Sequence, residues 1–303
     1  MAPRTAFFGT PATAVPALAA LCAATRVELV VTRPDRARGR SGTPQPPAVK
    51  EAALAWGLPV EQPARAADVA PRLDGLDLCV VVAYGHILPA AMLEIPHRGF
   101  VNLHFSRLPR WRGAAPVARA ILAGDETTGV DLMALDAGMD TGDLIARREV
   151  GIEDDDTTGT LTGRLAGRGA ELLLATLPGI LDGSAIRTPQ PETGITHAAK
   201  LEKAAGRLNP STMSADECDR VVRAFNPNPG AWGMVDGGRI KVWRSRVAET
   251  GDLEPGVTRR DGDRVLVGTP AGAWELIEVQ AAGKGRMTAA TWARGHRGAF
   301  HWE

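Results

Sequence analysis

The sequence predicts a chain of the α/β class, in which a doubly wound, mostly parallel sheet precedes a small β-barrel of OB type. Two observations support this order. Up to about residue 181, short apolar strand patterns alternate with helical patterns, as they do when helices cover both faces of a parallel sheet. Beyond residue 206, short strand patterns follow one another closely and are separated by turns rich in aspartate and glycine, which is typical of a small barrel.

Composition limits the classes to which the chain can belong. Its 303 residues are enough for two domains with separate cores, and 44% hydrophobic and 23% charged residues are usual for a globular protein. The formal net charge is zero, so the surface as a whole is not built for a polyanion. No signal-peptide pattern begins the chain, and no run approaches the roughly 20 apolar residues of a membrane span. We therefore expect no membrane segment and a cytoplasmic location.

The first predicted strand, residues 5–8, runs into Gly9, after which Val15, Leu18 and Leu21 repeat at helical spacing. A strand, a glycine turn and a helix in this order suggest a nucleotide-binding crossover. The turn reads GTPATA, however, and lacks the GxGxxG glycines that cradle a pyrophosphate. We interpret it as a tight turn between strand and helix.

A basic loop, residues 33–50, follows the second predicted strand, residues 27–32. Its prolines and glycines exclude long regular elements, and Asp35 is its single acid. One interpretation is a solvated connection; the other is contact with a phosphate backbone, because the loop is long and carries charge of one sign. The cations of this loop are Arg33, Arg36, Arg38, Arg40 and Lys50.

The third strand, residues 78–83, is apolar throughout, which predicts a central place in a parallel sheet. Further strands are predicted at 100–103, 130–135 and 144–150, and a long helix at 158–181. The segment 183–206 has the composition of a linker. We therefore predict a first domain over 1–182 and a second over 207–303. The second contains a helix at 214–225 and strands at 231–235, 240–247, 264–267 and 273–279.

Polar side chains gather where two predicted strands end. Asn102 and His104 come at the end of strand 100–103, and the run 130–135 ends in a turn with the pattern DxGxDxGD. An amide, an imidazole and carboxylates at the ends of neighbouring strands can move a proton and stabilise an oxyanion. Each residue alone is more often structural, but together they indicate a catalytic site. We interpret Asp136 and Asp143 as turn-forming residues.

Other candidate sites are weaker. The three cysteines are far apart and show no CxxC spacing, which argues against a zinc site or a disulfide framework. Five tryptophans of the second half could stack on bases, but tryptophans buried in a barrel are the commoner explanation. They are Trp232, Trp243, Trp274, Trp292 and Trp302.

Several segments resemble the methionyl-tRNA formyltransferases. The pattern NLHxSxLPxWRGAAP, which begins at Asn102, and the later GMDTGD are typical of all folate-dependent formyltransferases. RAFNPNPGAW and AGKGRM indicate the branch of that family that acts on tRNA. The resemblance extends over essentially the whole chain, in order and in spacing, and also includes FFGTP and VVVAYGHILP.

The resemblance implies a Rossmann-like formyltransferase domain followed by an OB-like tRNA-binding domain. It also implies transfer of the formyl group of 10-formyltetrahydrofolate to the amino group of methionine on initiator methionyl-tRNA. We expect that the protein uses no metal and is a monomer. The catalytic residues that it implies are Asn102, His104 and Asp140. The residues implied for folate are Ser106, Arg107, Leu108 and Pro109, and those implied for tRNA are Arg38 and Arg40.

Arg107 departs from the family pattern, which has leucine there. Its cation could meet the glutamate tail of the donor, or it could point to water. Three other functions remain open at this point: formylation of an amino sugar nucleotide or another small amine, hydrolysis of the formyl group by activated water, and binding of folate or RNA without catalysis. The second half of the chain argues against the first, and the combination of Asn102, His104 and Asp140 argues against the last.

Overall fold

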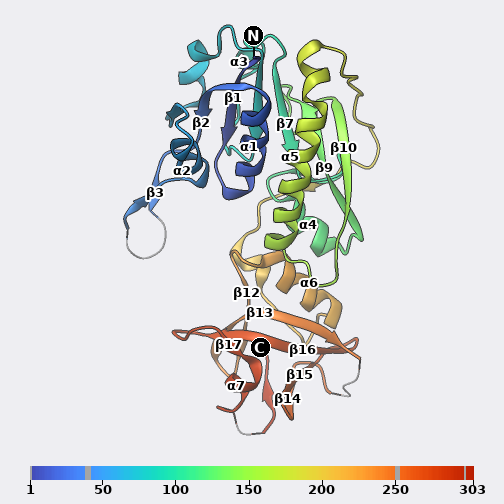
Figure 1. The fold of residues 1–303 in the computed structure, drawn as a ribbon. Helices are drawn as coiled ribbons and strands as arrows, with labels where there is room; N and C mark the ends of the chain where they lie inside the picture. The colour runs from blue at the N-terminus through green and yellow to red at the C-terminus, as the bar shows by residue number, and fades with distance from the viewer. Residues whose placement is uncertain (1, 38–41, 250–252, 297) are drawn as a thin grey trace. The chain divides into compact units, whose positions relative to one another are not determined.

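The computed structural model describes residues 2–37, 42–249, 253–296 and 298–303, and it divides the chain into two compact units. Figure 1 shows the order of the elements along the chain. No helix within the described residues is both long enough and apolar enough to cross a membrane. The N-terminal unit contains Met1–Gly113, Thr127–Gly151 and Thr162–His197. The C-terminal unit contains Ala114–Glu126, Ile152–Leu161 and Ala198–Glu303.

A seven-stranded, mostly parallel sheet forms the centre of the N-terminal unit, as the sequence predicts, with the order β10-β9-β7-β6-β1-β2-β5. The apolar strand β6 lies in the middle of this order, and all five of its residues are buried. β9 runs antiparallel to β7, and β10 antiparallel to β9. The strands are β1 (Arg4–Gly9), β2 (Arg26–Val31), β5 (Val60–Glu61), β6 (Leu78–Val82), β7 (Phe100–His104), β9 (Thr127–Ala134) and β10 (Leu144–Gly151).

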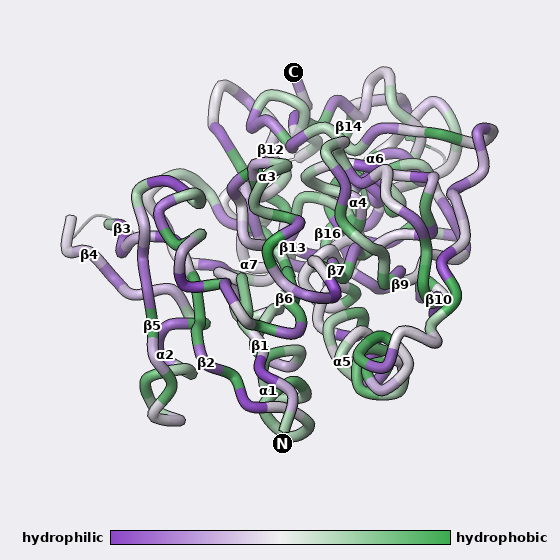
Figure 2. Tube along the Cα trace, turned by 90° about the horizontal axis from the view of Figure 1, so that it is seen from above, coloured by the Kyte–Doolittle hydropathy of each residue, from purple (hydrophilic) through white to green (hydrophobic). Residues whose placement is uncertain are grey.

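Helices accompany this sheet. They are α1 (Val15–Ala24), α2 (Ala48–Ala55), α3 (Ala90–Leu93) and α5 (Thr158–Asp182), with 3-10 turns η1 (Ala12–Ala14) and η2 (Ala66–Leu73). The first four residues of α5 belong to the C-terminal unit. In Figure 2, α5 shows both hydrophobic and hydrophilic residues, as a helix packed on a sheet should.

The long helix α5 decides which face of β7 is free for chemistry. A Cβ at Gly169 of α5 would lie 3.2 Å from the Val130 side chain and 3.4 Å from that of Leu103, so helix and sheet touch closely there. Leu103 therefore faces α5. Because neighbouring residues of a strand point to opposite faces, Asn102 and His104 point to the other face of the sheet.

The basic loop is partly regular. Two short strands, β3 (Arg36–Ala37) and β4 (Pro44–Gln45), pair antiparallel within it, and α2 begins before the loop ends. Asp35 accepts hydrogen bonds from Lys50 at 2.9 Å, so the single acid of the loop neutralises one of its cations. Arg38 and Arg40, the residues predicted to contact tRNA, lie outside the described residues.

The C-terminal unit contains an almost closed antiparallel barrel with the strand order β12-β13-β16-β15-β14-β18. A bridge between Val235 and Trp302 joins its ends, and β17 pairs with β16. The predicted OB-like barrel is thus confirmed, with β14, β17 and β18 added to the predicted strands. Its strands are β12 (Ala231–Val235), β13 (Gly238–Ala248), β14 (Val257–Asp261), β15 (Arg264–Gly268), β16 (Ala273–Ala281), β17 (Met287–Thr288) and β18 (Phe300–His301).

The helices α4 (Pro116–Ala123), α6 (Ala215–Phe225) and the short α7 (Ala289–Ala293) belong to this unit as well, and α6 packs on α4 and on β13. The side chain of Ser214 accepts a hydrogen bond from the Glu217 backbone and the Glu217 carboxylate accepts one from Ser214, so a capping box fixes where α6 begins. In the barrel, Trp274 and Trp302 are buried with ring centroids 5.5 Å apart. These two rings are therefore part of the core.

Candidate active site

His104 ends strand β7, and 6% of the residue is exposed. Its Nε2 lies 2.9 Å from the carbonyl oxygen of Trp111. A carbonyl can only accept, so we assign the ring hydrogen of the neutral imidazole to Nε2. Nδ1 then carries the lone pair, and it lies 3.6 Å from Oδ1 of Asp140. A proton taken up at Nδ1 would create an imidazolium directly beside a carboxylate.

Asp140 is held in place by its backbone and by its second oxygen. Its Oδ2 accepts a hydrogen bond from the backbone N–H of Gly113 at 2.8 Å, and its φ is +54°, a conformation that few side chains adopt readily. Within the same turn, Asp136 accepts hydrogen bonds from Thr141 and from the backbone N–H of Gly138. Asp136 thus stabilises the turn, and Asp140 is the carboxylate that faces the imidazole.

The antiparallel pairing of β7 and β9 changes how Asp140 reaches His104. The sequence places both at the ends of neighbouring strands. In the structure, Val101 pairs with Ala134 and His104 with Asp131, so β9 ends beside the start of β7. The two strand ends therefore lie at opposite edges, and it is the turn after β9 that carries Asp140 back to the imidazole.

Asn102 lies two residues before His104 on the same strand and is 9% exposed. Residues i and i+2 of a strand share a face, so its amide is on the side of the sheet that carries the imidazole. Within the described part of the chain, the Asn102 side chain has no hydrogen-bond partner. A nearly buried amide in this state can donate to a ligand oxygen.

Two residues that the sequence analysis did not identify, Asp131 and Arg147, hold the stretch Ser106–Pro109 in place. Asp131 is completely buried and meets Arg147 in a bidentate ion pair, with N–O distances of 2.7 and 2.6 Å. Asp131 Oδ2 accepts from the Leu108 N–H at 2.8 Å, and Arg147 Nη2 donates to the Leu108 carbonyl. Both backbone groups of Leu108 are thus fixed, while Ser106 Oγ donates to the Arg110 carbonyl at 2.7 Å.

Burial and ion pairing shift the pKa of the Asp131 carboxyl in opposite directions. Burial raises the pKa of the Asp131 carboxyl, while the hydrogen bonds from Arg147 and Leu108 oppose that change. The hydrogen bond that Arg147 donates to Asp131 raises the pKa of Arg147. The signal in the sequence was a lone acid inside the apolar strand run VDLMA, with an arginine in the strand that follows.

Arg107 turns toward the neighbouring strands. Its guanidinium lies 2.6 Å from the Glu149 carboxylate and donates to Thr127 Oγ1 at 3.3 Å. In this structure its charge is balanced by Glu149 of β10.

The segment after α5, which has the composition of a linker, contributes two further positioning residues. Gln190 Nε2 donates to the backbone carbonyls of Asp140 and Gly142, at 2.9 and 2.8 Å, while its Oε1 accepts from Arg112. Thr196 Oγ1 accepts from the Trp111 N–H at 2.8 Å. Composition gave no sign of these contacts, because they are made to backbone groups from an irregular segment.

The arrangement can take up or give a proton at Nδ1 of His104, stabilise the imidazolium through Asp140, and offer an amide donor from Asn102. Among the described residues, no group of three or more His, Cys, Asp or Glu is placed to hold a metal ion.

Comparisons with known proteins identify the family of the chain. The formyl transferase family matches residues 4–177, and the formyl transferase C-terminal domain matches residues 200–297. A methionyl-tRNA formyltransferase of Chromobacterium violaceum is 45% identical over 296 residues, covering 95% of each chain. One of Streptomyces coelicolor is 46% identical over 298 residues, covering 96% of each.

Solved structures share the fold at low identity. WlaRD, a sugar 3N-formyl transferase solved with dTDP and 5-N-formyl-THF, gives a TM-score of 0.71 at 16% identity over 94% of this chain and 100% of its own. The N-formyltransferase of Helicobacter canadensis, solved with folinic acid and dTDP-3-aminofucose, gives 0.72 at 16% identity over 93% of this chain and 100% of its own. HypX of Aquifex aeolicus, solved with tetrahydrofolic acid, gives 0.63 at 16% identity over 96% of this chain and 47% of its own.

Proposed function

The chain belongs to the methionyl-tRNA formyltransferase family, enzymes that formylate initiator methionyl-tRNA, and we propose that it draws the formyl group from 10-formyltetrahydrofolate at Asn102, His104 and Asp140. The observation that carries the proposal is the placement of Nδ1 of His104, 3.6 Å from Asp140, on the face of β7 that also bears Asn102. Solved relatives of the fold hold folate derivatives, which supports a folate donor.

Formyl transfer requires a neutral amine, a stabilised oxyanion and a path for one proton. The α-amino group of an aminoacyl ester attacks the formyl carbon, which creates an oxyanion and a positively charged nitrogen. The Asn102 amide donates to the oxyanion. His104 accepts the amine proton at Nδ1, Asp140 stabilises the imidazolium, and the proton then passes to the nitrogen of the departing tetrahydrofolate as the C–N bond breaks.

The remaining assignments complete the proposal. Ser106, Leu108 and Pro109 contribute to the folate site, which the Asp131–Arg147 pair would keep in shape. Arg107 is part of the same stretch and is proposed as a folate-binding residue with it. The catalytic domain spans 1–182, a linker 183–206 and the tRNA-binding domain 207–303, in a monomer of the cytoplasm.

A competition between acceptors tests the proposal. Purified protein is given 10-formyltetrahydrofolate together with charged initiator tRNA or with a nucleotide-linked amino sugar. We expect formyl-methionyl-tRNA and little formylated sugar, because the C-terminal barrel belongs to the family that acts on tRNA. Ready use of the sugar without use of tRNA would show a sugar formyltransferase. Release of formate at a comparable rate without any acceptor would show a hydrolase.

A further inference from the structure

One backbone carbonyl, that of Trp111, determines which ring nitrogen of His104 carries the hydrogen. Nε2 lies 2.9 Å from this carbonyl, and Nδ1 lies 3.6 Å from the Asp140 carboxylate. The carboxylate favours the opposite tautomer, because a hydrogen on Nδ1 could be donated to it. The Trp111 carbonyl must therefore outweigh Asp140 if Nδ1 is to keep the lone pair that accepts the amine proton.

Trp111 holds this carbonyl in a backbone conformation that tryptophan rarely adopts. Its φ is +64°, in the left-handed region. A residue in this conformation persists only where its surroundings hold it, and such residues cluster at functional sites. Without a restraint, the Trp111 backbone would relax to negative φ, and its carbonyl would turn away from Nε2.

Thr196 provides the restraint through its hydroxyl and both of its backbone groups. Its Oγ1 accepts a hydrogen bond from the Trp111 N–H at 2.8 Å. Its N–H donates to the Pro109 carbonyl at 3.3 Å, and its carbonyl accepts from the Arg112 N–H at 3.0 Å. The hydroxyl thus fixes the N–H end of the residue whose carbonyl end meets His104. A substitution of Thr196 removes only the hydroxyl bond, because the other two are made by the backbone.

We propose that Thr196 is a positioning residue that selects the tautomer of His104 through the backbone of Trp111. The inference rests on the proposed function, because the lone pair on Nδ1 matters only if His104 accepts the proton of the amine. Without the hydroxyl, Trp111 relaxes and the ring hydrogen moves to Nδ1, beside Asp140. The imidazole then has no lone pair at the position where the amine proton arrives.

The kinetic test compares two substitutions of Thr196 in the full-length enzyme. Thr196→Val keeps the branched shape without an acceptor, whereas Thr196→Ser keeps the hydroxyl. For Thr196→Val we expect kcat to fall about 10- to 100-fold, as release of one strained residue would cause, with unchanged KM for tRNA and folate. Thr196→Ser should restore most of the rate. Thr193→Val, at an exposed threonine of the same segment, is the matched control and should behave as wild type.

A ¹⁵N NMR spectrum of the histidine rings reads the tautomer directly and needs no substrate. His104 is identified among the six histidines by comparison with His104→Ala. We expect the hydrogen on Nε2 in the wild type and in Thr196→Ser, and on Nδ1 in Thr196→Val. Thr196→Ala also lacks the hydroxyl and should show the same change, so the inference stays testable if one variant folds poorly.

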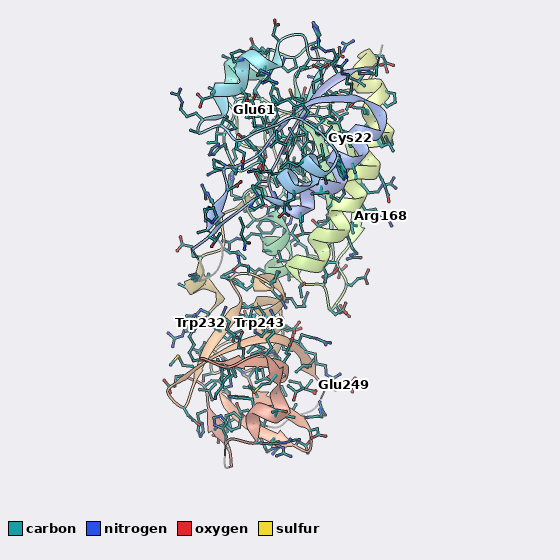
Figure 3. The ribbon with its side chains drawn as sticks, turned by 60° about the vertical axis from the view of Figure 1, so that its left-hand side comes forward. Cys22, Glu61, Arg168, Trp232, Trp243 and Glu249 are labelled. Atoms are coloured by element: carbon teal, nitrogen blue, oxygen red, sulfur yellow. The ribbon has the colours of Figure 1, made fainter. Side chains whose placement is uncertain are left out.

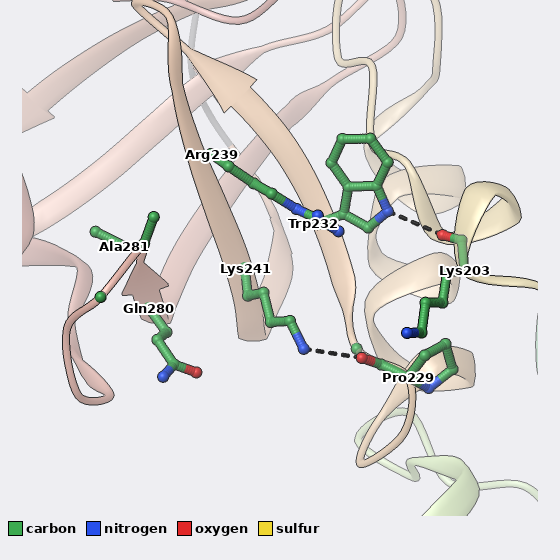
Figure 4. Close-up of a pocket in the computed structure, with 10 residues that line it drawn as sticks. Lys203, Pro229, Trp232, Arg239, Lys241, Gln280 and Ala281 are labelled. Atoms are coloured by element: carbon green, nitrogen blue, oxygen red, sulfur yellow. Dashed lines mark hydrogen bonds between the residues drawn. The ribbon is translucent and has the colours of Figure 1, made fainter. Parts of the chain in front are cut away.

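A variant with weakened tRNA binding gives the contrasting kinetic pattern. Arg239 lines a pocket of the C-terminal unit (Figure 4), where its guanidinium lies 4.1 Å from the ring centroid of Trp232, which Figure 3 labels. This cation belongs to the domain proposed to bind tRNA. Arg239→Gln should therefore raise KM for tRNA and leave both kcat and the His104 tautomer unchanged.

The outcomes separate the inference from the proposed function. If the wild type formylates tRNA and Thr196→Val keeps either the wild-type kcat or the wild-type tautomer, the inference is wrong and the proposed function stands. A loss of rate that Thr196→Ser does not restore would also overturn the inference, because the hydroxyl would then not be responsible. If the wild type transfers no formyl group to tRNA, the proposed function itself is wrong, whichever tautomer the spectrum shows.

Discussion

Asp131 and Arg147 form an ion pair, and both residues hydrogen-bond to the backbone of Leu108: Asp131 accepts from its N–H and Arg147 donates to its carbonyl. The pair connects β9 and β10 to the loop that follows His104. Two antiparallel strands at the edge of the sheet thereby determine the shape of the stretch assigned to folate. Since the loop lacks regular structure of its own, its conformation depends on this anchor.

Removing one partner of this pair should destabilise the protein. Arg147→Gln leaves the Asp131 carboxylate fully buried without its cation, and we expect about 3 kcal/mol less free energy of unfolding, measured with urea. Asp131→Asn combined with Arg147→Gln should recover part of this loss, because no charge is then left buried. Arg148→Gln, an exposed neighbour, is the control. An unchanged unfolding midpoint for Arg147→Gln would contradict the anchoring role.

The charge of Asp140 should matter more than its hydrogen bond. Asp140→Asn keeps an acceptor for Gly113 N–H and tolerates the positive φ, but it cannot stabilise an imidazolium. We expect kcat to fall by about 10² to 10⁴, as should that of His104→Ala, with an unchanged circular dichroism spectrum. Near-normal rates in either variant would remove that residue from the proposed mechanism.

Gln190 should act on the rate through the Asp140 turn. Gln190→Ala removes the donor to the carbonyls of Asp140 and Gly142, so Asp140 should lose its fixed distance to the imidazole. We expect kcat to fall about tenfold with little change in KM for tRNA, and Glu192→Ala, an exposed neighbour, to behave as wild type. A change confined to KM would indicate a binding role instead.

Arg40 should contribute to tRNA binding without affecting folate. Arg40→Ala is expected to weaken tRNA binding and to reduce its salt dependence by about one counter-ion, while the affinity for the folate donor stays unchanged. Filter binding over a range of salt, with folate binding followed in parallel, checks this. Equal losses for tRNA and folate would point to a general disturbance of the N-terminal unit.

The three cysteines should differ in reactivity. Burial raises the pKa of Cys218 to about 12 and raises that of Cys79 strongly, so few thiolates exist at pH 8. Cys22 is only partly buried, although its pKa is also raised. We expect iodoacetamide at pH 8 to modify Cys22 first in the native protein and all three only after denaturation, as read by peptide mass mapping. Early labelling of Cys79 would contradict the central place of β6.

The sequence alone determined the α/β sheet, the barrel and the family. Apolar runs such as residues 78–83 report burial directly, because a strand covered on both faces needs no polar residue. The motifs around Asn102 and Asp140 predicted a catalytic site, since they combine residue types that few structural roles require.

Only the tertiary structure decided the strand pairing and the hydrogen-bond partners of the polar side chains. That β9 runs antiparallel to β7, so that the Asp140 turn must fold back to His104, depends on strand pairing over long sequence distances. The contacts of Gln190 are made to backbone carbonyls, which every residue possesses and no composition reveals. The pairing of Arg107 with Glu149 likewise required two strands to be placed side by side. The local hydrophobic periodicity specifies the helices and strands. The partners of individual polar groups are fixed only when folding brings distant segments together.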